Sequence, residues 1–265
     1  VSRLADLIGL TGTVVFGPGD VELVTGEPEL RRRFLDYSFA KTDPDYLRRL
    51  LEYRRILRQR NALLRSGEGL RHLEIWTERL AGAGAAIIHA RRRNLVALGE
   101  SASRFYAQMS PASEGLELKY RSRTEGEDEQ ALEAYLGARL AALRSSELLK
   151  KRTLAGPHRD DMMIDIGGHN ARKFASQGQK RSAAVALKLA QAEYLARVRR
   201  DRPIVFLDDV FSELDGDRRE KLCQLVGKNY QTFLAAPQVE DLRGEFFGEL
   251  RGFGLESGRI RVDPK

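Results

Sequence analysis

Hydrophobic residues recur every three or four positions along the first half of the chain, a spacing that predicts helices. One stripe runs from about Pro44 to Arg65, and most arginines of this segment lie off it. The stripe consists of Tyr46, Leu50, Tyr53, Leu57, Asn61 and Leu64. A second long helix is predicted from about Leu70 to Met109. Since only a short glycine-containing turn separates them, the two helices are expected to form an antiparallel hairpin.

The second half of the chain alternates between strand-like and helix-like patterns. Strands are predicted at Thr13–Phe16, Leu116–Tyr120, Met162–Ile166, Pro203–Leu207 and Thr232–Leu234, and helices at Leu132–Lys151, Lys180–Arg200 and Gly216–Gly227. The segment Pro203–Leu207 is almost continuously apolar, which is typical of a central strand buried on both faces. Strands that alternate with helices indicate an α/β layer. Between about Asp36 and Lys151 the pattern instead predicts a mainly helical module.

Charge and cysteine content narrow the classes of partner and site. The 265 residues carry a formal net charge of +7, and the sequence pI is about 9.6. This favours DNA or another polyanion as partner, although a solvated basic surface remains an alternative. The single cysteine, Cys223, excludes an intrachain disulfide and a cysteine-rich zinc site. No apolar run is long enough for a membrane span, so we expect a cytoplasmic protein without a membrane partner.

The strongest chemical signal is a run of apolar residues that ends in two carboxylates, Asp208 and Asp209. A buried strand would hold both acids at the carboxyl edge of a parallel sheet, where α/β proteins bind ligands. Asp208 could then support Mg²⁺ through water, and Asp209 could orient or deprotonate an attacking water. The alternative is that these residues only cap the turn after the strand.

Two further segments flank this strand. Ala175–Ser182 contains a candidate phosphate-binding helix start, because glycine lets backbone N–H groups approach an anion at a helix N-terminus. Ser176 offers a hydroxyl there and Gly178 a close approach of the backbone, and Gln177 and Gln179 lie in the same segment. The other segment is Ser212–Asp215, which closely follows Asp209. Its candidate functional residues are Ser212 and Asp215. Read alone, the first segment could be an ordinary glycine-containing helix start, and the second an ordinary N-cap.

In this order and spacing, the three segments resemble the signature motif, Walker B strand and D-loop of ABC-type ATPases. The string Gly156-Pro157-His158-Arg159-Asp160-Asp161 resembles the RecF family in particular, as do Phe16–Asp20, Gly26–Asp36 and Tyr53–Leu64. This resemblance covers nearly the whole chain. It implies the C-terminal part of an ABC-type P-loop ATPase head, an α/β fold with an inserted, mainly helical lid domain. The expected division is 1–35 for the end of the N-terminal lobe, 36–151 for the lid, and 152–265 for the C-terminal lobe.

The resemblance also implies a function, ATP-dependent DNA binding in recombinational repair. Two subunits would sandwich ATP and Mg²⁺, clamp duplex DNA near single-strand gaps with little sequence specificity, and help load the RecA recombinase. RecR is the implied partner, alone or with RecO. Ser176–Gln179 would complete the nucleotide site of the other subunit, and the D-loop would couple the two sites. His158 and Arg159 are candidate phosphate or DNA contacts, although His158 could instead satisfy Asp160 within a structural turn.

Clusters of arginine in or beside the helical module are the candidates for a DNA-facing surface. The candidates are Arg31, Arg32, Arg33, Arg54, Arg55, Arg91 and Arg92. Phosphate contacts from such residues would give affinity without sequence information. The alternative for each cluster is a solvated helix face.

The sequence departs from the family pattern at three places. No Gly-x-x-x-x-Gly-Lys-Ser/Thr string occurs in the 265 residues, so the P-loop is expected upstream of Val1, and this chain alone is not expected to hydrolyse ATP. Asp209 stands where most ABC enzymes have Glu, which fits slow hydrolysis. Ala235 and Ala236 stand where the family has a polar γ-phosphate sensor, and neither side chain can form a hydrogen bond. Gly17 and Gly19 also replace the family's more usual Ser and Glu.

Two other functions compete with this interpretation. An SMC or Rad50-like head would need a long coiled coil, and the segment between Asp36 and Lys151 is too short for one. A non-catalytic scaffold that binds DNA or RecR would need no P-loop at all. The coding sequence upstream of Val1 would discriminate between scaffold and ATPase.

Overall fold

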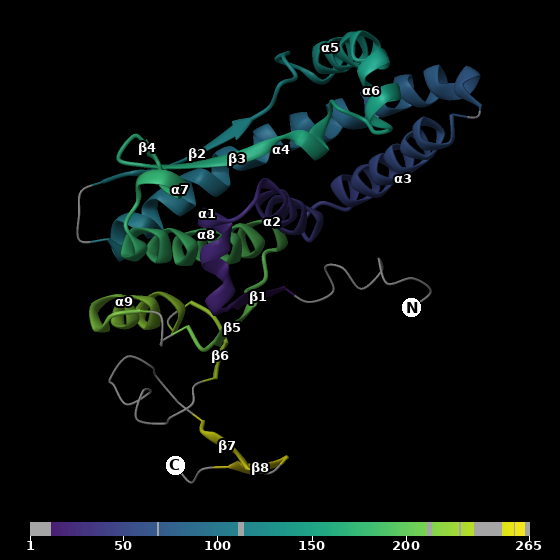
Figure 1. Cartoon of the computed structure of the whole chain (residues 1–265). Helices are drawn as coiled ribbons and strands as arrows, with labels where there is room; N and C mark the ends of the chain where they lie inside the picture. Colours follow the sequence, from purple (N-terminus) through teal and green to yellow (C-terminus); the bar gives the residue numbers. More distant parts are fainter. Residues whose placement is uncertain are drawn as a thin grey trace.

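A long helical hairpin dominates the molecule (Figure 1). The computed structural model describes residues 12–67, 69–110, 114–210, 214–227, 229–235, 251–256 and 258–262. Helix α3 (Pro44–Ser66) begins at Asp43, whose carboxylate accepts hydrogen bonds from the N–H groups of its first turn. It ends at Gly67, whose φ of 72° suits glycine. Helix α4 (Leu73–Met109) returns along it, which confirms the predicted hairpin.

Shorter helices pack around the hairpin. The hairpin is preceded by α2 (Pro28–Ala40) and followed by α5 (Glu129–Ala142) and α6 (Arg144–Lys150). The sequence pattern predicted one helix from Leu132 to Lys151, whereas the structure has two, which meet at Leu143. The remaining short elements are η2 (Pro18–Val21), α1 (Glu22–Thr25), η3 (Leu70–His72), η4 (Pro157–Arg159) and α7 (Ala171–Phe174).

The predicted α/β layer contains a parallel sheet in the order β1-β5-β6. Its strands are β1 (Thr13–Phe16), β5 (Ile204–Asp208) and β6 (Thr232–Ala235). Val14 is paired with Val205, and Asp208 with Ala235, so the carboxyl ends of these strands lie at one edge. Helices α8 (Gln177–Arg199) and α9 (Gly216–Gly227) pack on one face of this sheet.

The expectation that β5 is buried on both faces is wrong for the described part of the chain. Val205 and Leu207 are buried against α8 and α9, but Phe206 on the other face is only half-buried. It stacks on Phe233, with ring centroids 5.1 Å apart, and Phe233 is 47% exposed. The apolar run therefore reflects one core-facing row and one row that the described residues cover only in part.

A second sheet joins the helical hairpin to the α/β part of the molecule. Strand β2 (Leu116–Arg121) follows α4, and it pairs antiparallel with β3 (Asp161–Ile166) over its whole length. Strand β4 (His169–Asn170) continues this sheet from β3. Near the C-terminus, β7 (Phe253–Glu256) and β8 (Arg259–Val262) form a separate hairpin.

One hydrophobic core extends from the hairpin into the α/β part. It includes Tyr53 of α3, Leu98 of α4, Leu136 of α5 and Leu187 of α8. The expected boundary between residues 35 and 36 falls inside α2. The division into three domains thus remains a prediction. No helix in the described ranges is long and apolar enough to cross a membrane.

Candidate functional site

The two acidic residues of the central strand lie where the sequence predicts them. Asp208 is the last residue of β5 and is exposed, and Asp209 follows it, half-buried. The Asp209 N–H donates to the Ala235 carbonyl oxygen at 3.2 Å, and its φ is +50°. Aspartate tolerates this left-handed conformation better than most residues, because its short side chain can bond locally.

The predicted signature segment forms the start of α8. Ser176 is its N-cap: the Ser176 Oγ accepts from the Gln179 N–H at 3.2 Å, and the Gln179 side chain accepts from the Ser176 N–H at 2.7 Å. This reciprocal capping box satisfies two N–H groups, and the helix dipole adds positive potential at this end. Ser176 and Gln177 are exposed, and Gly178 is half-buried. The segment is therefore a helix start and an exposed surface at once.

Arg218, which sequence reasoning missed, links this helix start to the segment after β5. Its Nε donates to Ser182 Oγ at 2.8 Å, and its guanidinium also pairs with Asp215. A Cβ at Gly178 would lie 3.2 Å from the Arg218 guanidinium, so the arginine rests directly against the glycine. The only sequence signal was the i,i+3 spacing of Asp215 and Arg218.

Some of the predicted residues in this region lie outside the described ranges. These are Ser212 of the expected D-loop and Ala236 after β6. Asp215 is described: its carboxylate accepts from the Arg218 N–H at 3.0 Å, which holds the pKa of Asp215 below its usual value. Ala235 ends β6 beside Asp208 and offers no side-chain hydrogen bond. No group of three or more metal-binding side chains occurs in the described residues.

The Gly156–Asp161 string forms the turn that leads from α6 into β3. His158 Nε2 lies 3.3 Å from the Thr153 carbonyl oxygen, and Nδ1 lies 2.6 Å from the Tyr53 hydroxyl. Because a carbonyl oxygen only accepts, Nε2 carries the proton and Nδ1 accepts from Tyr53. Burial lowers the pKa of His158 to about 4. A neutral imidazole with both nitrogens engaged fits the structural alternative, with Tyr53 and Thr153 as partners in place of Asp160.

Asp160 and the next residue are also engaged. The Asp160 carboxylate accepts from the Tyr120 hydroxyl at 2.9 Å, and burial raises its pKa. Asp161 accepts two hydrogen bonds from Arg31, at 2.8 and 2.9 Å. Gly156 has a φ of 125°, and a Cβ there would lie 2.6 Å from the Tyr53 hydroxyl. Glycine is thus required at the start of this turn.

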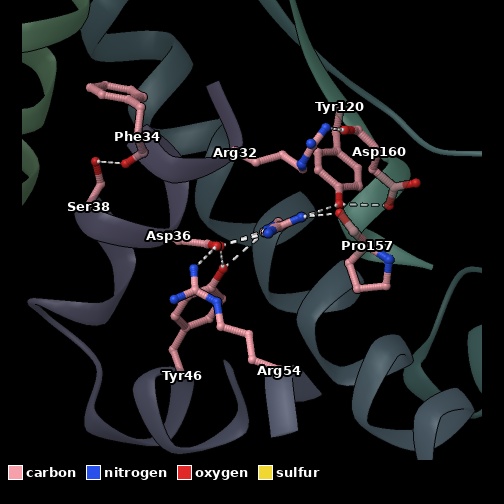
Figure 2. Close-up of polar contacts among 10 residues, drawn as sticks. Arg32, Phe34, Asp36, Ser38, Tyr46, Arg54, Tyr120, Pro157 and Asp160 are labelled. Carbon is pink, nitrogen blue, oxygen red and sulfur yellow. Dashed lines mark hydrogen bonds and ion pairs between the residues drawn. The ribbon is translucent and has the colours of Figure 1, made fainter. Parts of the chain in front are cut away.

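A buried polar network ties the turn to three helices (Figure 2). Its centre is Arg91 of α4, which donates to Asp36 at 2.7 Å, to the Pro157 carbonyl oxygen at 2.9 Å and to Tyr120 at 3.2 Å. Asp36 of α2 also accepts from Tyr46 at 2.6 Å and from Arg54 at 3.1 Å. The network therefore connects α2, α3 and α4 with β2 and the turn before β3.

These contacts correct part of the predicted DNA-facing set. Arg91 is 3% exposed and Arg31 is 5% exposed, and both are held by carboxylates inside the protein. They are structural residues and do not face a ligand on the surface. Arg60 is a third buried arginine, paired with the buried Glu147 at 2.6 Å. A buried cation without such a partner would be strongly destabilising.

The other arginines predicted to face DNA differ in their exposure and in their contacts within the protein. Arg33 and Arg55 are exposed. Arg54 is exposed but paired with Asp36. Arg32 is half-buried and donates to the Asp160 carbonyl oxygen at 2.8 Å. Arg92 is also half-buried and donates to the carbonyl oxygens of Gly126 and Thr124, at 2.6 and 2.7 Å.

Known proteins resemble this chain over nearly its whole length. A protein of Chloroflexus aurantiacus described as DNA replication and repair protein RecF is 37% identical over 271 residues, which cover 98% of this chain and 69% of the relative. The protein of the same description from Heliobacterium modesticaldum is 39% identical over 265 residues, covering 97% and 71%. No protein-family model matches the chain.

Solved structures lead to the same group of proteins. The structure of the recombination mediator protein RecF-ATP in the RecFOR pathway matches with a TM-score of 0.87 and 34% identity, over 98% of this chain and 69% of that one. The structure of RecF-ATPrS from the same pathway matches with a TM-score of 0.87 and 32% identity, over 99% and 70%.

Proposed function

Since this chain belongs to the RecF family of DNA replication and repair proteins, we propose that it is part of an ATP-dependent DNA-binding protein of recombinational repair. The observation that carries this proposal is the pair of acidic residues at the carboxyl edge of β5, combined with the exposed, capped start of α8. Relatives whose structures are described as RecF-ATP support nucleotide binding.

The residues present fit one part of a nucleotide site. Asp208 is exposed at the strand end and offers oxygen ligands, as Mg²⁺ requires, and Mg²⁺ keeps most of its waters when few carboxylates hold it. Bound ATP would supply the phosphoryl group that is transferred to water. Asp209 would accept a proton from the attacking water or orient it. The phosphate-binding loop is not among the 265 residues, so this chain alone would not complete the site.

The exposed start of α8 fits a role across a dimer interface. Ser176 and Gln177 are exposed on the surface, and the helix N-terminus favours an anion. These residues would contact the phosphates of ATP held by a second copy, so ATP would bring two copies together. Arg218 lies against Gly178 of this segment and is paired with Asp215, so a movement of the segment would also move these two side chains.

Exposed arginines in or beside the helical module would contact the DNA backbone. Arg33, Arg55 and Arg93 are exposed. Contacts from such side chains to phosphates are not sequence-specific and weaken as salt increases. The partners we propose beyond DNA are RecR and RecO, the outcome is loading of RecA, and the compartment is the cytoplasm.

The test is DNA binding by the full-length protein with and without ATP, for the wild type, Asp209→Asn and the control Asp201→Asn. Asparagine tolerates the positive φ of residue 209, so the variant removes charge without straining the backbone. Exposed Asp201 lies before β5 and outside the proposed site. We expect ATP to strengthen DNA binding in all three proteins, and the ATP-bound complex of Asp209→Asn to last at least tenfold longer.

A different result would favour the scaffold. The lack of a polar side chain at Ala235, where a phosphate sensor is expected, is the observation on its side. DNA binding that ignores ATP in all three proteins would establish it and remove the roles given to Asp208 and Asp209.

A further inference from the structure

An arginine-lined cavity lies between the helical module and the turn before β3. Its volume is about 180 Å³. The wall includes Arg121 at the end of β2, Arg123 just beyond it, Arg139 of α5 and Arg159 of the turn. It shares no residue with the edge that holds Asp208, Asp209 and the start of α8, so it is separate from the proposed nucleotide site.

The cations of this cavity lack carboxylate partners within the described part of the chain. None of these four arginines forms an ion pair there, although two aspartates also line the cavity. Asp161 is paired with Arg31 through both oxygens, whereas the buried Asp160 accepts from the neutral Tyr120 hydroxyl, so its charge can offset one of the four arginines. The described residues therefore leave an excess of positive charge in the cavity.

Size and exposure select the kind of anion. At about 30 Å³ per water, the cavity holds about six waters, which is enough for one phosphate group and part of its hydration shell. It is smaller than the roughly 300 Å³ and more that is usual for whole small-molecule ligands. Arg121, Arg123 and Arg159 are exposed, so a ligand could extend from the cavity into solvent. These features fit one phosphate of a longer chain better than a free nucleotide.

We propose that this cavity binds a single backbone phosphate of DNA, as a fixed anchor point outside the nucleotide site. The guanidinium fork of arginine matches the oxygens of a phosphate and can bind it bidentately. The proposal rests on the DNA-binding function proposed above and adds the location of one contact. Such a contact gives affinity and orientation without reading the sequence.

The test compares two double variants of the full-length protein. Arg121→Gln with Arg139→Gln removes two charges from the cavity. Arg144→Gln with Lys150→Gln removes two charges from exposed positions on α6, outside the cavity. Binding of a short labelled duplex is measured over a series of salt concentrations, and thermal unfolding shows that each variant is folded.

We expect the cavity variant to lose about tenfold in DNA affinity at low salt. The slope of log affinity against log salt concentration should also be shallower by about one, as for the loss of one phosphate contact. The α6 variant should stay close to the wild type. Arg139→Lys keeps the charge but not the fork, so it should keep the salt dependence and lose affinity. Equal losses in the two double variants would reduce the effect to general charge and overturn the proposal.

A second measurement separates DNA from free phosphate. Inorganic phosphate binding is followed by ³¹P NMR in the wild type and the cavity variant. Loss of phosphate binding with unchanged DNA affinity would mean that the site takes a small phosphorylated molecule, which overturns the assignment to DNA. A wild type that binds no DNA would overturn the proposed function itself. If the wild type binds DNA and the cavity variant binds it equally well, this inference alone is overturned.

Discussion

His158 makes the stability of the protein depend on pH. Burial lowers its pKa in the folded protein to about 4, whereas an unfolded imidazole titrates near 6.5. Below pH 6.5 the unfolded chain therefore binds a proton that the folded protein does not. Stability that is fully present above pH 6.5 is lost progressively as the pH falls toward 4.

We predict that this linkage destabilises the wild type by up to about 3 kcal/mol between pH 7 and pH 4. His158→Gln should be less stable at pH 7 but should lose less stability on acidification. The free energy of unfolding from urea titrations across this range measures both effects. His72→Gln, at an exposed position, is the control and should follow the wild type. Parallel pH profiles for wild type and His158→Gln would contradict the assignment.

Substitution of two arginines in one run should have different effects on the stability of the protein. Arg91→Met leaves Asp36 buried with fewer partners and should lower the free energy of unfolding by about 3–5 kcal/mol. Arg93→Gln, at an exposed position, should change it by less than about 0.5 kcal/mol. It should instead weaken DNA binding at low salt. Urea unfolding of both variants checks the first contrast, and a large loss of stability in Arg93→Gln would contradict it.

The buried arginines could have been found from helix phase. Arg91 lies four residues after Ile87 and four before Leu95, both buried. Arg60 lies four residues after Ile56 and four before Leu64. The prediction grouped arginines by their adjacency in the sequence and not by helix face, and it therefore placed Arg31 and Arg91 on the DNA-facing surface. The carboxylate partners could not be foreseen, since Asp36 and Arg91 are far apart in the sequence.

At the scale of elements, α8 and α9 share a hydrophobic core, and Arg218 adds a polar link between their N-terminal ends. Arg218 bonds to Ser182 of α8 and pairs with Asp215 at the start of α9. It also rests against Gly178, the glycine of the segment proposed to face the second copy. Movement of one helix start would therefore be transmitted to the other through this guanidinium.

We predict that Arg218→Ala weakens the ATP-dependent part of DNA binding more than the ATP-independent part. Stability should fall by only about 1 kcal/mol, because the side chain is half-buried. Arg218→Lys keeps the charge but not the forked geometry and should restore little. Gln224→Ala, exposed on α9, serves as the control. Equal losses with and without ATP in Arg218→Ala would reduce the residue to a structural role.

Helices and strands were predictable because each has a periodic apolar face. The predicted limits of the hairpin helices, about Pro44 to Arg65 and Leu70 to Met109, lie within a few residues of those observed. Pairings between distant strands were not predictable in the same way. The long register of β2 with β3 joins segments about forty residues apart, and nothing in either strand alone specifies its partner.

At the scale of the whole molecule, the continuous core bears on how the protein unfolds. Residues of α3, α4, α5 and α8 contribute to a single hydrophobic cluster. We predict one cooperative unfolding transition for the hairpin and α8 together. The single tryptophan, Trp76 on α4, reports on the hairpin by fluorescence, and far-ultraviolet circular dichroism reports on all helices. The two urea transitions should coincide, whereas separate midpoints would show an independently folding helical domain.

The length of α4 has a mechanical consequence. Its 37 residues span about 55 Å, from Leu73 beside α3 to Met109 in the core that α8 and α9 share. If α4 moves as a rigid body, it would act as a lever whose Met109 end is packed against α8 and α9, the helices that flank the proposed nucleotide site. A rotation of about 5° at Met109 would displace the far tip by roughly 5 Å, given this length. A small angular change where ATP is expected to act would thus become a movement as large as the spacing of one helical turn.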